Sequence, residues 1–210
     1  MRILKRDYLL KKKIEEKIEK SLKFCNGKLL DIGCGNKPYL DLFLGFVDEY
    51  VGLEHPSQKK RFGKAVEIYA DCLNLPFAEN TFDTIICFEV LEHLEDPFLF
   101  FGQVYKALKP GGYLLLSVPQ TYQLHDKADY FRFTSEGLKL LCKKSGLRVV
   151  KIMPIGNFLM RVAVKTNYFF TTSPWKPLGL FFIPLINIVF DKISRDSSLE
   201  PCNNFLIARK

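Results

Sequence analysis

The fold of this chain is decided by residues 29–36, which read LLDIGCGN. The first four residues predict a buried strand, and the Gly-x-Gly that follows predicts a tight turn leading into a helix. Glycines there let the backbone approach a ligand closely, and the helix start presents free N–H groups. A second strand ends about twenty residues later in Glu54, where a nucleotide-binding fold places a carboxylate that accepts hydrogen bonds from both ribose hydroxyls. We therefore expect a nucleoside-bearing ligand here; the alternative is an ordinary turn and a surface glutamate.

Short apolar runs separated by turns and helical stretches continue along the chain. They lie at residues 29–32, 50–53, 66–69, 82–88, 113–118 and 147–153, with a last run at 203–208. Strands that alternate with helices form a parallel sheet, so we expect an α/β fold to which the last run returns as a final strand. Asp96 and Pro97 predict the start of a helix that the sequence KPGG at 109–112 stops. Thr134 predicts the start of another, which Gly146 ends.

Composition indicates one domain with additions: 210 residues, of which 48% are hydrophobic and 26% charged. The formal charge of +8 is concentrated at the ends, since residues 1–28 hold ten Lys/Arg against four Asp/Glu and residues 155–210 hold seven against three. Residues 29–154 hold fourteen against sixteen. The basic ends could meet lipid head groups, a phosphate-bearing substrate or nucleic acid, or could be solvated helix faces.

The N-terminal segment and the cysteines bear on location. Leu10, Ile14, Ile18 and Leu22 lie four apart and predict an amphipathic helix with one narrow apolar stripe, which we expect to lean on the core. This segment lacks the uninterrupted apolar stretch of a secretion signal. The six cysteines are far apart and have no nearby histidine, so we expect reduced thiols, no metal site and a cytoplasmic chain.

A strongly apolar stretch, Trp175–Phe190, lies in the insert before the last strand. Pro177, Gly179, Pro184 and Asn187 interrupt it, and its charge-free run is too short to cross a bilayer of about 30 Å as a helix. We expect a mostly helical cap whose exposed apolar face, bordered by cations, meets a membrane surface or a lipid-linked acceptor. The alternatives are burial in the core and a homodimer interface.

Six segments, in order, resemble the class I S-adenosylmethionine-dependent methyltransferases, and among these the small enzymes similar to ubiquinone and menaquinone methyltransferases. They are LDIGCG (30–35), YVGLE (50–54), ADCLNLPF (70–77), TFDTII (81–86), EVLEHL (89–94) and LKPGG (108–112). The resemblance implies S-adenosylmethionine as cofactor, S-adenosylhomocysteine as product, and a Rossmann-like, doubly wound, mostly parallel seven-stranded sheet. We expect an N-terminal helix at 1–27, the cofactor-binding core at 28–154, the hydrophobic insert at 155–200 and the final strand at 201–210.

The resemblance also implies roles for the cofactor-binding residues. Asp31, Gly33, Cys34 and Gly35 would line the amino-acid end of the cofactor, Glu54 would hold the ribose, Asp71 and the backbone of Cys72 would meet the adenine, and Phe88 and Glu89 would lie near the methionine moiety and the methyl group. A nicotinamide dinucleotide is the competing cofactor. The turn lacks the third glycine that lets a helix pack closely under a pyrophosphate, which favours the methyl donor.

Candidates on the acceptor side lie after the fourth and fifth strands. His93 and His125 are candidate bases, which are needed if the acceptor is a protonated oxygen. Residues 125–134, HDKADYFRFT, resemble a loop of family members linked to surface-glycan or lipid-linked biosynthesis. That resemblance makes Asp129 and Tyr130 substrate-binding candidates and Arg132 a catalytic one. Alternatively, His93 bonds to a neighbouring loop, and Arg132 and Asp129 form a structural pair.

Together these features predict a methyltransferase acting on a small-molecule or lipid-linked acceptor, of glycan or quinone type, in the cytoplasm or at the inner membrane face. A non-catalytic S-adenosylmethionine-binding module is the alternative. Nucleic acid is disfavoured as the acceptor. Family members that methylate base amino groups usually carry Asn/Asp-Pro-Pro-Tyr/Phe after the fourth strand, where this chain reads FEVL at residues 88–91.

Overall fold

The computed structural model describes residues 5–121 and 128–210. Its strands form one sheet in the order β3-β2-β1-β4-β5-β7-β6, in which every pair is parallel except those that β7 makes. The strands are β1 (Lys28–Ile32), β2 (Glu49–Glu54), β3 (Ile68–Tyr69), β4 (Phe82–Phe88), β5 (Leu108–Pro119), β6 (Arg148–Ile155) and β7 (Asn203–Arg209). The expected mostly parallel, seven-stranded, Rossmann-like sheet is confirmed.

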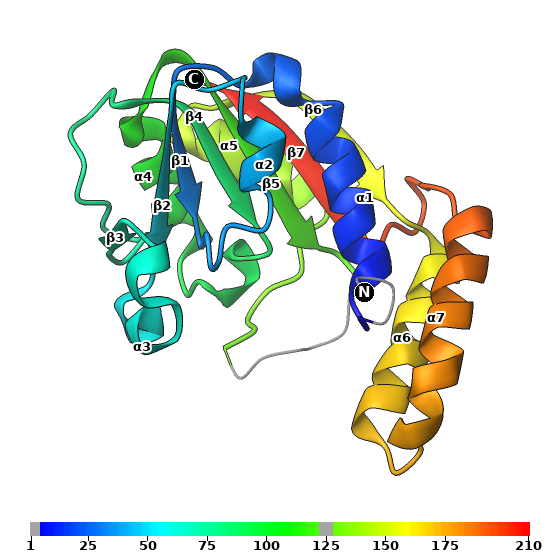
Figure 1. Ribbon diagram of the computed structural model, residues 1–210. Coiled ribbons are helices and arrows are strands. Elements are labelled where there is room, and N and C mark those ends of the chain that lie inside the picture. Colours follow the sequence, from blue (N-terminus) through cyan, green and yellow to red (C-terminus); the bar gives the residue numbers. More distant parts are fainter. Residues whose placement is uncertain (1–4, 122–127) are drawn as a thin grey trace.

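Helices cover both faces of the sheet (Figure 1). They are α1 (Tyr8–Glu19), α2 (Leu40–Phe43), α3 (Lys59–Phe62), α4 (Pro97–Ala107), α5 (Ser135–Ser145), α6 (Phe158–Thr172) and α7 (Lys176–Ile193), with short 3₁₀ turns at Leu22–Phe24, Pro56–Gln58, Gly63–Ala65 and Leu91–His93. Alternate residues of each strand point to opposite faces. Leu114 and Leu116 therefore pack in the core under α4 and α5, whereas Leu115 packs in the core under α1 and α2.

Capping residues place the helix ends as the sequence predicts. The Asp96 side chain accepts a hydrogen bond from Leu99 N at 2.9 Å, and that of Thr134 accepts one from Gly137 N at 3.1 Å. Gly146 ends α5 in the left-handed conformation. One strand boundary differs: β5 begins at Leu108, because that residue pairs with Phe82 before the ladder shifts register. The KPGG segment therefore stops α4 but also belongs to the strand.

The chain direction across the sheet changes between β1 and β4. From β1 the order runs outward through β2 to β3, and from β4 it runs outward through β5. Open α/β sheets bind ligands outside the carboxyl ends of their strands at such a switch point. The structure therefore places the candidate site where β1 and β4 end.

The insert forms an antiparallel hairpin of α6 and α7 that projects beyond the carboxyl ends of the parallel strands (Figure 1). It begins after Ile155, which is still part of β6, one residue later than the expected boundary. Among the described residues, none of the helices combines the length and the apolar character needed to cross a membrane.

Candidate cofactor and acceptor site

The turn after β1 is held close to β2. Gly33 N and Cys34 N both donate to the carbonyl of Leu53, at 2.8 and 3.2 Å. Gly33 has a φ of +73°, and a Cβ there would lie 2.3 Å from Val90 Cγ2. No side chain fits at this position, so the turn brings bare backbone to the switch point.

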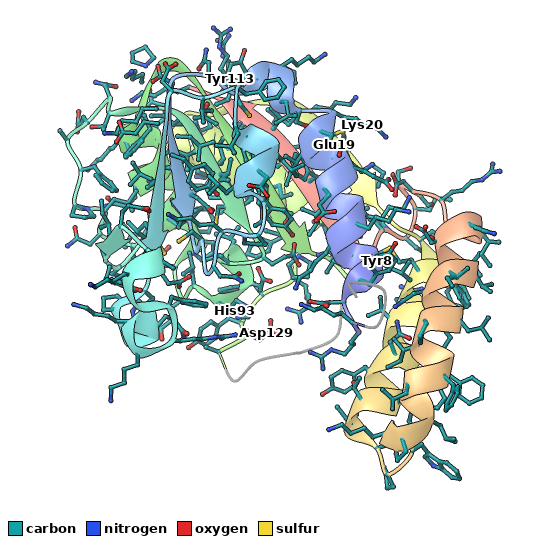
Figure 2. All side chains as sticks on the ribbon, in the orientation of Figure 1. Tyr8, Glu19, Lys20, His93, Tyr113 and Asp129 are labelled. Atoms are coloured by element: carbon teal, nitrogen blue, oxygen red, sulfur yellow. The ribbon has the colours of Figure 1, made fainter. Side chains whose placement is uncertain are left out.

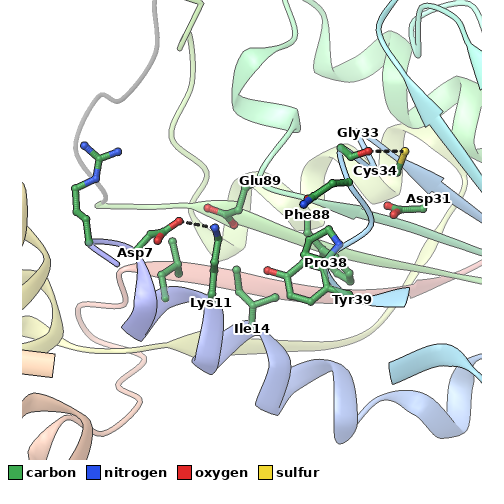
Figure 3. Close-up of a pocket in the computed structure, with 14 residues that line it drawn as sticks. Asp7, Lys11, Ile14, Asp31, Gly33, Cys34, Pro38, Tyr39, Phe88 and Glu89 are labelled. Carbon is green, nitrogen blue, oxygen red and sulfur yellow. Dashed lines mark hydrogen bonds and ion pairs between the residues drawn. The ribbon is translucent and has the colours of Figure 1, made fainter. Parts of the chain in front are cut away.

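A cavity opens between this turn, the end of β4 and the amino-terminal half of α1 (Figure 3). The sheet side contributes Asp31, Gly33, Cys34, Gly35, Asn36, Pro38, Tyr39, Phe88 and Glu89, and α1 with the residue pair before it contributes Arg6, Asp7, Leu10, Lys11 and Ile14. The structure thus brings together all four residues predicted to meet the amino-acid end of a cofactor, together with Phe88 and Glu89.

Asp31 is a buried carboxyl at the end of β1. Only 5% of it is exposed, and it accepts a hydrogen bond from the Tyr50 hydroxyl at 2.5 Å. Burial raises the pKa of Asp31 to about 7, against the lowering effect of this hydrogen bond. A cationic group in the cavity would stabilise the ionised form of this carboxyl, which burial disfavours.

Glu89 is the second acidic group of the lining. It follows β4 with a φ of +57°, a conformation uncommon for a residue with a side chain. Its carboxylate accepts hydrogen bonds from Ser117 Oγ at 2.7 Å and from Asn203 Nδ2 at 2.8 Å. Burial raises the pKa of Glu89, and Arg132 opposes that rise. Its position is therefore held by three strands, β4, β5 and β7.

The residues predicted for the ribose and the adenine lie farther along the same edge, outside the cavity lining. Glu54 Oε2 accepts a hydrogen bond from Gly35 N at 2.9 Å, which joins the end of β2 to the turn after β1. Asp71 follows β3 and accepts from Leu73 N at 2.8 Å. Cys72 is buried beside it. Their backbone order matches the strand order β1, β2, β3, so they form a row along the edge.

The acceptor-side candidates form a separate cluster next to Glu89 rather than part of the cavity lining. The His93 ring nitrogen Nδ1 bonds to the carbonyl of Ala128, and Arg132 forms a two-point ion pair with Asp129. Tyr130 is 51% exposed and donates to Glu95 at 3.2 Å. Figure 2 shows His93 and Asp129 at the edge of the sheet opposite Tyr113. His125 lies outside the described residues.

Sequence reasoning missed several residues of the site. Leu10, Ile14 and Ile18 of the expected stripe are buried, whereas Leu22 lies beyond α1 in a 3₁₀ turn and is half-buried. The neighbouring residues Asp7 and Lys11, an ion pair at 2.6 Å, line the cavity. Asn203 was also missed. The sequence feature that could have revealed Asn203 is a pair of asparagines at the start of a strand that is otherwise apolar. Because β7 runs antiparallel to β5, the first residue of β7 lies at the carboxyl end of β5.

A doubly wound sheet with a glycine turn and two carboxyls, Asp31 and Glu89, at its switch point defines a Rossmann-like cofactor-binding protein. A family model described as a methyltransferase domain matches residues 4–152, and the chain belongs to this family.

Named relatives and solved structures are in keeping with this assignment. A probable S-adenosylmethionine-dependent methyltransferase of Mycolicibacterium smegmatis is 28% identical over 101 residues, which cover 45% of this chain and 39% of that protein. Phosphoethanolamine N-methyltransferase 1 of Triticum aestivum is 31% identical over 100 residues, covering 43% of this chain and 20% of that protein. This chain thus spans less than half the length of these relatives.

Solved structures share the fold. A SAM-dependent methyltransferase from Archaeoglobus fulgidus has a TM-score of 0.61 at 20% identity, over 94% of this chain and 93% of that one. Phosphoethanolamine N-methyltransferase 2 of Haemonchus contortus, in complex with S-adenosyl-L-methionine, has a TM-score of 0.59 at 18% identity, over 94% and 52%. With the family established, S-adenosylmethionine is the cofactor.

Proposed function

We propose that this protein transfers a methyl group from S-adenosylmethionine to a small-molecule or lipid-linked acceptor held between α1 and the ends of β1 and β4. The observation that carries the proposal is a pair of carboxyls, the buried Asp31 and the half-buried Glu89, that line one cavity beside the Gly33 turn. S-adenosylmethionine has cationic ammonium and sulfonium groups, and acidic walls complement both.

The roles proposed for the cofactor-binding residues follow their order along the edge. Asp31 would bind the ammonium group, with Cys34 and Gly35 beside the amino-acid end. Glu54 would exchange its hydrogen bond with Gly35 N for bonds from the ribose hydroxyls. Asp71 and the backbone of Cys72 would bind the adenine, since a carboxylate accepts from its amine and a backbone N–H donates to a ring nitrogen.

The bound cofactor supplies an activated methyl group, which moves from its sulfur to the acceptor and leaves S-adenosylhomocysteine. What the chain adds is placement, because holding the nucleophile in line with the methyl carbon lowers the barrier to displacement. Phe88 packs against Tyr39 edge to face at 5.5 Å between ring centroids and gives this part of the cavity a rigid wall. Glu89 would hold the acceptor hydroxyl or amine and accept its proton.

The chemical class of the acceptor is proposed from the residues that α1 contributes to the cavity lining. Leu10 and Ile14 of α1 are apolar, and Arg6 lies beside the Asp7–Lys11 ion pair, so this wall carries one net positive charge. An acceptor with an apolar body and an anionic group, such as a lipid-linked glycan or a quinone precursor, matches this mixture. Asp129, Tyr130 and Arg132, together with His93, would complete acceptor recognition from the neighbouring cluster. His125, outside the described residues, is proposed for the same role on the sequence resemblance alone.

We further propose a cytoplasmic location at the inner face of a membrane. All six cysteines are buried free thiols, which supports a reducing compartment. The apolar hairpin supports the membrane face.

The test is turnover of methyl-labelled donor with acceptors that vary one feature at a time: an apolar tail with and without a phosphate or carboxylate. We expect transfer to acceptors carrying both features. Calorimetry with S-adenosylhomocysteine accompanies it. Donor-product binding without transfer to any acceptor would instead identify a non-catalytic binding module.

A further inference from the structure

The outer face of α7 carries a row of large apolar side chains into solvent. Phe181 is 78% exposed and Leu180 is 72% exposed. The row continues with Leu178, Leu185, Ile188 and Val189. No acidic residue occurs between Lys176 and Phe190. An exposed apolar area of this size marks an interaction surface.

The inner face of α7 is already occupied, so the outer face is not needed for folding of the hairpin. Gly179 lets α7 approach α6 closely, and the rings of Phe170 and Phe182 stack at 5.3 Å. Asn167 and Asn187, both fully buried, share a hydrogen bond of 2.8 Å across the two helices. Buried polar groups of this kind set the register of two helices. The packing therefore fixes which side of α7 points outward.

Around this face the acidic side chains are paired, whereas several cationic side chains are not. Each acidic residue of the segment 155–200 is engaged: Asp191 with Lys12, Asp196 with Lys17, and Glu200 with Arg161. Within residues 5–121 and 128–210, the exposed cations Lys165, Lys176, Lys192 and Arg195 form no ion pair. An apolar row with unneutralised cations at both ends is complementary to an anionic surface.

We infer that the outer face of α7 binds the surface of an anionic lipid bilayer, with its apolar row in the outer acyl region and its cations at the head groups. Long cationic side chains can reach the head groups while their stems stay with the apolar row. A second copy of the chain fits less well. In an antiparallel symmetric pairing, Lys176 of each copy would approach Lys192 of the other, with no free acidic residue to neutralise them.

The hairpin is tied to the helix that lines the cavity. Lys12 of α1 pairs with Asp191 of α7, Asn187 donates to the carbonyl of Lys5 at 3.2 Å, and the Arg6 guanidinium stacks over Tyr168 of α6 at 5.1 Å. The hairpin projects beyond the carboxyl ends of the parallel strands (Figure 1), and the cavity is lined by residues at the ends of β1 and β4. Membrane docking would therefore bring the cavity to the lipid surface. The conclusion that docking serves a lipid-linked acceptor rests on the proposed function, whereas binding of α7 to the bilayer does not.

The test is sedimentation of the full chain with phosphatidylcholine vesicles, with or without phosphatidylglycerol, at low and high salt. We expect at least tenfold more bound protein on the anionic vesicles at low salt, and less at high salt because salt screens the cations. The double variant F181S/L185S should lose at least tenfold in vesicle binding. The matched control, Leu140→Ser, changes an apolar residue of α5 that is 48% exposed and should bind as the parent does.

Calorimetry with S-adenosylhomocysteine on the same proteins shows whether each is folded. Unchanged donor-product affinity with lost vesicle binding supports the inference, whatever the acceptor is. It is overturned if the parent remains in the supernatant with every vesicle. It is also overturned if sedimentation velocity shows that the parent is a dimer and F181S/L185S a monomer, since the face would then join two copies.

Discussion

Asn203, the first residue of β7, donates its side-chain amide to Glu89 Oε2 at 2.8 Å and so ties the last strand of the chain to the residue that follows β4. These residues are 114 positions apart in sequence. They meet because β7 runs antiparallel beside β5, which places its first residue at the carboxyl edge of the parallel strands. Glu89 thus keeps its place through the insertion of β7 into the sheet.

Replacement of Asn203 by leucine should raise the pKa of Glu89 further, because one donor to its carboxylate is lost. If Glu89 accepts a proton from the acceptor, the acid limb of the pH profile of kcat/KM should move to higher pH, with a rate loss of roughly tenfold at neutral pH. The same change in a Glu89→Gln background should have little effect on rate. Equal losses in both backgrounds would show that Asn203 acts only on the fold.

Donor affinity should depend on pH through Asp31, whose pKa burial raises to about 7. Binding of the donor ammonium favours the ionised carboxylate, so affinity should fall toward tenfold per pH unit below 7 and level off above it. Asp31→Asn should bind weakly without this dependence. Calorimetric titration with S-adenosylhomocysteine across this range is the measurement, and a flat wild-type profile would contradict the assignment.

Asp31 should also affect stability. Its folded pKa of about 7 lies above the ordinary value of 3.8, so between these values the folded state binds the proton more strongly than the unfolded state does. The contribution of Asp31 to stability therefore falls as pH rises from about 4 to about 7. Asp31→Asn lacks this loss, so its thermal midpoint relative to wild type should increase with pH over that window and then remain constant. Thermal denaturation at several pH values checks the sign.

Glu54→Ala should weaken donor-product binding by about 1.5–3 kcal/mol, the range for hydrogen bonds to a charged group. Glu49→Ala is the matched control. It removes a carboxylate from the other end of the same strand, where Glu49 pairs with Lys28 at 3.0 Å far from the turn. Calorimetry should show the loss only for Glu54→Ala. Similar affinities for a folded Glu54→Ala protein and the wild type would defeat the ribose assignment.

The loop cluster should affect turnover but not donor binding. Arg132→Ala breaks the ion pair with Asp129, and His125→Ala removes a candidate base, so both should lower kcat/KM for the acceptor at nearly constant donor affinity. Arg132→Lys keeps the charge but loses the two-point geometry and should recover only part of the rate. Lost donor affinity in Arg132→Ala would point to a purely structural pair.

Much of the fold was predictable because its signals are local. The apolar run ending in Asp31 and Ile32, the glycines after it, and the capping residues Asp96 and Thr134 act through neighbours in sequence. Backbone conformation and helix ends depend on such short-range contacts, so pattern alone located the strands, the ends of α4 and α5 and the edge of the sheet where the candidate site lies.

Tertiary structure decided what depends on contacts between distant segments. It placed Asp7 and Lys11 of α1 in the cavity, brought Asn203 to Glu89, and turned the apolar row of α7 outward while Asn187 faced Asn167. A helical period says which residues share a face but not what that face will meet. The partner of each face depends on how the helices and strands pack into one core. The orientation of each helix is the one that buries the apolar faces of all these elements at once.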